Sequence, residues 1–343
     1  MDENFHLPEE FAFSHWYCFF LHDQLVETLT SAEEANVFNI VINFKDESHS
    51  KAINGLSGEV FIDWLEKNGY KSDVIILYYK QLCAALMSDF LHFIYESLQC
   101  SRKGKLTVAY ALLRKPLKEN LFFMEWLLAR PGDFLKRFEE VNPHRFKLPH
   151  PESLSESEYI AIIREAAENT KTGLWVDAEF LHELRFKKKS NISLETLWQK
   201  ANHLVTSFKY METEACNLNF VFSDSNAHYS QWSIYYRFVP ILLFHAVEVI
   251  EGLLQRFAKR KNHEIDIMPL RNIAGMMLYL ENPPCVLDMK ESIDRFGKMF
   301  EKSELCCPNC KNAFKFHHDN ISLLYRNGSL LCEHGCGEIC LNP

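Results

Sequence analysis

Two pairs of closely spaced cysteines near the C-terminal end constrain this chain more than any other feature. Two residues separate the cysteines of the first pair, and three separate those of the second. Thiolates this close can bind one ion if the chain between them turns tightly, and structural zinc sites are tetrahedra of Cys or Cys and His ligands. Pro308–Asn309 favours such a turn in the first pair, and Gly337 allows positive φ after the second. The predicted ligands of one metal ion are Cys307, Cys310, Cys332 and Cys336.

The residues between the pairs predict how the site is built. They contain apolar segments followed by Asn327-Gly328, a dipeptide typical of hairpin turns. Two cysteine pairs joined by a hairpin resemble the zinc ribbon family, over about residues 304–343. The resemblance implies a small β-hairpin module with one structural Zn²⁺. The spacing of the second pair departs from the commonest ribbon, so three neighbours remain alternative ligands: Cys306, His334 and Cys340.

The cellular compartment bears on whether these cysteines bind metal or form disulfides. The first eleven residues have no basic start and no apolar signal core. The most apolar run, Phe238–Ile250, contains His245 and Glu248 and is too short to span a bilayer. We therefore expect a cytoplasmic protein without a membrane segment. Thiols stay reduced there, which favours metal ligation.

The rest of the chain is predicted to be mainly α. Glycine and proline are sparse, at 12 each among 343 residues, and apolar residues recur at helical spacing over long stretches. Residues 72–98 and 106–129 are the longest of these in the first half, the second with a break expected at Pro116. We expect a multi-helix bundle body over residues 1–303, with a possible subdivision at a Pro- and Ser-rich linker, residues 142–158, and the zinc-ribbon module over residues 304–343.

Charge limits the partners of the module. The chain has a formal net charge of −9, and the segment from residue 304 onward carries three basic and four acidic residues. A ribbon that binds phosphates should be basic, so these charges favour a structural staple or a protein-docking module. A protein partner or a homo-oligomer is expected, and RNA remains a possible partner.

Charged residues inside the apolar stretch Ala109–Trp126 indicate a second candidate site. Arg114 and Glu119 could form a polar site inside the bundle. The alternative is that they form one internal ion pair or are two charges on solvated helix faces. The stretch resembles the Leu-Leu-Arg…Glu helix of bacterial HEPN-like helical proteins, and the resemblance covers at most residues 75–260. Some of those proteins are ribonucleases in toxin–antitoxin and phage-defence systems. The resemblance thus implies a metal-independent ribonuclease that acts as a dimer.

HEPN ribonucleases carry an Arg and a His separated by four to six intervening residues, placed at the start of a helix. Arg145 and His150 have this spacing here, as do Arg137 and His144, but both pairs lie in or beside the proline-rich linker. His245 is expected to be a core histidine bonded to a neighbouring side chain. Glu179 and His182 have the Glu-x-x-His spacing of di-iron helical bundles, but the second Glu-x-x-His motif that such a site needs is missing from the sequence.

Three functional hypotheses follow. The first is a zinc-binding interaction or accessory protein, in a bacterial stress or phage-defence setting that the HEPN-like resemblance implies. The second is the HEPN-like ribonuclease, and the third is nucleic-acid binding through the ribbon. The chain has no phosphate-binding loop, dinucleotide-binding, serine-hydrolase or zinc-protease motif.

Overall fold

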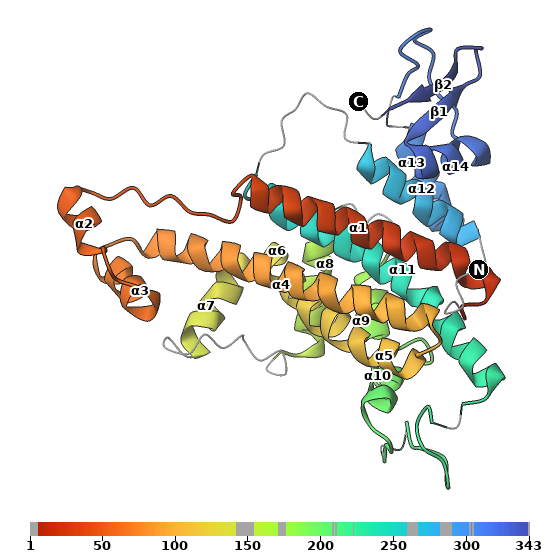
Figure 1. Ribbon diagram of the computed structural model, residues 1–343, viewed down its shortest axis with the longest axis horizontal. Coiled ribbons are helices and arrows are strands. Elements are labelled where there is room, and N and C mark those ends of the chain that lie inside the picture. The colour runs from red at the N-terminus through yellow and green to blue at the C-terminus, as the bar shows by residue number, and fades with distance from the viewer. Residues whose placement is uncertain are drawn as a thin grey trace.

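Helices make up most of the computed structural model, and a two-stranded sheet lies at its C-terminal end (Figure 1). The structure describes residues 6–141, 154–170, 176–207, 209, 211–221, 223–258, 267–281, 290–301, 303 and 305–341. The helices of the first half are α1 (Ala12–Glu34), α2 (Glu47–Ala52), α3 (Gly58–Lys67), α4 (Lys71–Arg102), α5 (Leu106–Arg114), α6 (Leu121–Ala129) and α7 (Pro131–Val141). The later elements are α8 (Glu156–Glu168), α9 (Ala178–Phe186), α10 (Glu195–Asn202), α11 (Ser225–Gln255), α12 (Met268–Glu281), α13 (Lys290–Glu301), α14 (His318–Asn327), β1 (Ser329–Cys332) and β2 (Gly337–Cys340). The predicted fold class, a mainly α body with a small β-hairpin at its end, is confirmed.

The long helix α11 runs through the centre of the body. It contacts α1 on one side and α6 on another, and α1 also packs against α4 (Figure 1). Asp224 caps the start of the helix, because its side chain accepts a 2.8 Å hydrogen bond from the Ala227 N–H. From Phe238 to Glu251 every residue is buried, as expected of a helix that is apolar on all sides. The core therefore forms around α11.

The predicted break at Pro116 is confirmed and takes the form of a π-helical turn, Lys115–Asn120, between α5 and α6. Proline has no N–H to donate to the preceding turn, so the regular hydrogen-bond ladder cannot continue through it. The wider turn lets the chain continue directly into α6, whose residues Leu121–Leu128 are all buried. In the predicted linker, residues 142–153 lie outside the described part. Ser155 and Glu158 form a capping box that starts α8 within the linker's last residues.

The predicted position of the hairpin turn is wrong. Asn327-Gly328 ends α14 instead, and Gly328 adopts the left-handed conformation, with φ 67°. Asn-Gly is also a common helix terminator, and the apolar residues before it, Ile321, Leu324 and Tyr325, follow the helical period. The strands pair antiparallel from Ser329↔Cys340 to Cys332↔Gly337, so the second cysteine pair forms the hairpin turn.

Two described helices, α4 and α11, are long and apolar enough to cross a membrane by length and composition. In α11, 89% of the most apolar window is buried inside the protein, as in a core helix, and in α4 the share is 33%. These helices are therefore weak evidence for a membrane span.

Candidate metal centre

The first cysteine pair lies on a tight turn that its own backbone closes. The Lys311 N–H donates to the Cys307 carbonyl at 2.8 Å, and the Cys307 N–H donates to the Asn312 carbonyl at 2.8 Å. Lys311 adopts a positive φ of 62°. The reversal turns the Cys307 and Cys310 side chains toward the same point.

The second pair lies on the β1–β2 turn. Gly335 and Gly337 have φ values of 85° and 81°, a region where a side chain would be strained. The positive φ expected at Gly337 is thereby confirmed. The Gly335 N–H donates to the Cys332 carbonyl at 3.3 Å, which closes the loop around Cys336.

Asn320 joins the two halves of the module. Its buried side chain donates to the carbonyls of Lys315, at 2.7 Å, and Leu331, at 3.1 Å, and accepts from the Leu331 N–H at 2.7 Å. One amide side chain thus ties the segment after the first pair to the strand that carries the second. Nothing in the cysteine spacing indicated this role.

The four cysteines of the two pairs meet at one point. Their Sγ atoms all lie within 4.8 Å of one another, and Cys310 Sγ lies 3.6 Å from Cys332 Sγ. Zn–S bonds of about 2.3 Å in a tetrahedron place neighbouring sulfurs ~3.8 Å apart, which fits this arrangement. The group could hold one metal ion. The three alternative ligands, Cys306, His334 and Cys340, lie outside it.

The protonation of the cluster suits a cation. A hydrogen bond from the Asn312 backbone, with those of the other three cysteines, lowers the pKa of Cys310 to about 6. Hydrogen bonding with Cys310, followed by burial, raises the pKa of Cys336 to about 12. One thiolate therefore forms readily near neutral pH, and a further one is opposed by the first negative charge. A bound cation removes that opposition.

The module is fastened to the body through α12 and α14. Arg271 of α12 donates through Nη2 to the Tyr325 carbonyl at 3.0 Å, near the C-terminal end of α14, where backbone carbonyls lack helical partners. The Tyr325 ring packs against Phe20 of α1, with centroids 5.0 Å apart. At Gly275 an added Cβ would lie 2.8 Å from Tyr17 Cδ2 and 2.9 Å from Tyr325 Cδ2. The core of the module is continuous with that of the body.

Among the described residues of the body, the sequence candidates are not brought together as a polar site. Arg114 and Glu119 form a 2.8 Å ion pair with each other, and their side chains are 35% and 43% exposed. Arg137 pairs with Asp133 at 3.1 Å. The remaining ribonuclease candidates, His144, Arg145 and His150, lie outside the described residues.

A polar cluster does lie inside the bundle, built from other residues. We call Glu125, Arg185 and His245 the buried triad; they come from α6, α9 and α11, and all three side chains have 0% exposure. Arg185 binds the Glu125 carboxylate through two hydrogen bonds, of 2.7 and 2.9 Å, and His245 Nε2 lies 2.6 Å from Glu125 Oε1. The expectation that His245 is a bonded core histidine is confirmed. Glu125 belongs to the stretch singled out in the sequence, but its partners lie 60 and 120 residues away.

The electrostatics of the triad follow from its burial. Burial alone would raise the pKa of Glu125, but Arg185 and His245 outweigh it and hold that pKa below its usual value. Burial lowers the pKa of His245 despite the nearby carboxylate. The triad is thus a carboxylate, a guanidinium and a neutral imidazole, with no net charge.

Comparisons of the chain with protein-family models, with curated proteins and with solved structures find no match. The geometry of the cysteine cluster therefore carries the functional argument.

Proposed function

We propose that this chain is a helical, zinc-binding accessory protein whose C-terminal module is held in shape by one structural Zn²⁺ and docks another protein. The observation that carries the proposal is the convergence of four thiols within 4.8 Å on two tight turns. An all-sulfur donor set favours Zn²⁺ among the common divalent ions, and four protein ligands leave no open position for a substrate. The ion's chemistry would be structural.

The shape of the module supports a docking role. The strands β1 and β2 form a two-stranded sheet whose outer edges have no strand partner in the described chain. Leu331 of β1 is 46% exposed, although it lies between buried neighbours. An exposed apolar residue on the surface of the module suits a protein partner better than phosphates. We further propose a cytoplasmic location, because the four thiols must stay reduced to bind the ion.

Metal content is the first test. The purified chain should contain about one zinc per molecule by elemental analysis, and Cys310→Ser should lose it because three thiolates hold the ion far less tightly. Cys306→Ser is the matched control, since it changes an exposed thiol one residue from a ligand. A zinc-free wild type, or equal zinc in both variants, would refute the site.

The docking role is tested separately, with a defined partner. A protein that copurifies with the chain in a fixed ratio should be released by Cys310→Ser, because the module loses its shape without zinc. Leu331→Glu should also release it if the exposed strand is the contact. Loss of the partner in Leu331→Glu with zinc retained supports the strand surface. Retention in both variants places the contact elsewhere on the chain and overturns the docking role of the module.

The ribonuclease alternative, and the phage-defence setting that goes with it, rest on the HEPN-like resemblance alone. We propose them only as a second function, which predicts RNA cleavage without added metal and its loss in His150→Ala. An unchanged cleavage rate in that variant would remove the residue on which the idea depends.

A further inference from the structure

A groove of about 380 Å³ runs along the contact between α1 and α4, which lie antiparallel beside each other (Figure 1). We call it the α1–α4 groove. Its lining residues recur every three or four positions, from His22 to Glu33 on α1 and from Ser88 to Glu96 on α4, so each helix contributes one face. At 1.5 Å per residue the α1 side is ~16 Å long, which is three helical turns.

The groove has an apolar floor and open sides. Leu91 is buried, and the buried ring of His22 bonds across the groove, with Nε2 3.2 Å from the Leu91 carbonyl. Val26 on α1 and Tyr95 on α4 are 39% and 42% exposed. All lining residues belong to α1 or α4, so no other described helix lines the groove.

The apolar surface continues beyond one end of the groove. The Phe19 ring contacts the rings of Tyr95 and Trp16, with centroids 6.0 and 6.1 Å apart, and Trp16 is 54% exposed. Exposed apolar residues that gather in one place mark contact surfaces, and Tyr and Trp are enriched in them.

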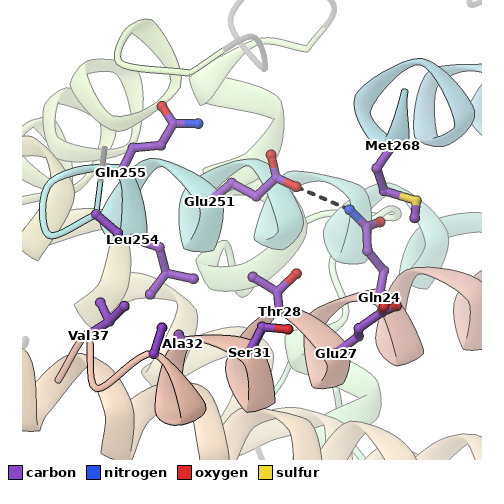
Figure 2. A pocket seen from close by; sticks show the side chains of 12 residues that line it. Gln24, Glu27, Thr28, Ser31, Ala32, Val37, Glu251, Leu254, Gln255 and Met268 are labelled. Atoms are coloured by element: carbon purple, nitrogen blue, oxygen red, sulfur yellow. Dashed lines mark hydrogen bonds between the residues drawn. The ribbon is translucent and has the colours of Figure 1, made fainter. Parts of the chain in front are cut away.

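The opposite face of α1 is already engaged with the body. Figure 2 shows Gln24 of α1 bonded to Glu251 of α11, and the distance from Gln24 Nε2 to Glu251 Oε1 is 3.1 Å. Leu21 on the same face is fully buried. The face that lines the α1–α4 groove is therefore the part of α1 that a partner can reach.

The charges along the groove are negative. Because the helices are antiparallel, Glu33 of α1 and Glu96 of α4 line opposite ends, and neither forms an ion pair with another described residue. Asp23, beside His22, adds a side chain that is 70% exposed. The sequence has no Lys or Arg from residue 12 to residue 34, nor from residue 81 to residue 101. The groove thus combines an apolar floor with a negative field.

This combination selects the occupant. A second copy of the chain would bring the same carboxylates together, and nucleic acid or an anionic lipid surface would add further negative charge. A groove between two helices offers no strand edge to extend, so a helix fits it better than an extended peptide. A basic helix with one apolar face matches both the shape and the charge.

We propose that the α1–α4 groove docks a basic amphipathic helix of a partner protein. The apolar face of that helix covers Val26 and Tyr95, and its Lys or Arg side chains pair with Glu33 and Glu96. The length of the groove places those cations about three turns apart on the partner. The proposal goes beyond the zinc module, because no residue of the groove belongs to that module.

The test measures binding of synthetic peptides of about 18 residues to the full-length chain, by fluorescence anisotropy at pH 7.5. The first peptide is a helix with a leucine face and a lysine face, the second has glutamate in place of every lysine, and the third scrambles the first. The leucine–lysine peptide should bind saturably at one site per chain, and the other two at least about tenfold more weakly. No saturable binding, or binding of either other peptide within about tenfold, would overturn the proposal.

Two double variants separate the groove from net charge. Glu33→Lys/Glu96→Lys should weaken binding of the leucine–lysine peptide at least about tenfold, because two attractions become repulsions. Glu66→Lys/Glu168→Lys makes the same change of net charge at exposed positions on α3 and α8, and should leave the affinity within about threefold. Equal losses in the two double variants mean that the peptide responds to net charge alone, and the proposal then fails.

The apolar contact has its own matched pair. Val26→Ser removes an exposed apolar side chain from the groove and should weaken the same peptide about fivefold, whereas Val60→Ser on α3, where the valine is 61% exposed, should have no effect. Unchanged affinity in Val26→Ser counts against the groove. If the chain sediments as a dimer that Val26→Ser dissociates, a second copy occupies the groove and the proposal is wrong.

Discussion

Replacing Arg185 by methionine should destabilise the protein strongly, because it leaves the Glu125 carboxylate buried without its cation. Arg185 donates two hydrogen bonds to that carboxylate, and both side chains have 0% exposure. It also donates to the Leu117 carbonyl at 3.4 Å, inside the π-helical turn. Breaking a fully buried ion pair by removing one partner costs about 3–5 kcal/mol.

That loss is measurable by chemical and thermal unfolding. An unfolding entropy of about 2.1 cal/mol/K per residue gives ~0.7 kcal/mol/K for a chain of this length, so the Tm of Arg185→Met should fall by ~4–7 °C. Arg185→Lys should also lose stability, since an ammonium cannot reproduce the two-pronged contact.

The double variant Arg185→Met/Glu125→Gln separates the ion pair from simple loss of packing. The glutamine keeps the shape of Glu125 and a hydrogen bond to His245 but needs no cation. We expect the double variant to be more stable than Arg185→Met by about 1–3 kcal/mol. If the two single losses simply add, the pair is not coupled and the reasoning fails.

The pH dependence gives an independent check on the triad. In the wild type the folded-state pKa values of both Glu125 and His245 lie below their usual values. The unfolded chain therefore binds more protons, and the triad's contribution to stability is lost as pH falls, first below the ordinary histidine pKa of about 6.5 and then below about 4.5. In Arg185→Met the sign reverses, because folding now favours a proton on the carboxylate or on the imidazole. The deficit of Arg185→Met relative to wild type should shrink between pH 8 and pH 6; a constant deficit would contradict this account.

Two further predictions concern the helices. Gly275→Ala should cost about 1–3 kcal/mol by thermal unfolding, because its Cβ would overlap Tyr17 and Tyr325. Gly297→Ala in α13 is the control: its Cβ would meet no atom within 4 Å, so this change should be neutral or slightly stabilising. Equal effects of the two changes would show that α12 is not packed this closely. Asp224→Ala should cost about 1 kcal/mol by removing the cap of α11, and Asp224→Asn, which can accept the same hydrogen bond, should restore most of it.

The sequence predicted the cysteine cluster because its ligands are local. Each pair is held by a turn of two or three residues, and only one helix separates the pairs, so the two pairs lie within reach of each other. The mainly α body was predictable for a similar reason, since apolar periodicity and sparse glycine are properties of short windows. The break at Pro116 is equally local, because it depends on one missing N–H.

The buried triad was not predictable in this way. The sequence singled out the stretch that contains Glu125 for Arg114 and Glu119, and the partners of Glu125 on α9 and α11 are specified only by tertiary packing. Arg114 and Glu119 were candidates because they stand in the same apolar stretch. Arg114 lies just before the π-helical turn and Glu119 lies in it; both side chains are partly exposed, and they pair with each other. Asn327-Gly328 shows the same limit, because one dipeptide serves two kinds of chain reversal and only the helical period before it distinguishes them.

Metal binding and docking of the module onto the body should be thermodynamically linked. The few core residues of the module, such as Leu324 and Leu330, are continuous with the core of the body, and Arg271 holds the end of α14 through the Tyr325 carbonyl. If the module folds fully only when docked, a variant outside the ligand set must lower zinc affinity, because binding free energy includes the cost of ordering the site. Arg271→Met should therefore release zinc to a competing chelator at lower chelator concentration than wild type. Unchanged zinc affinity, together with a lower Tm of the body, would mean that the module forms its metal site without help from α12.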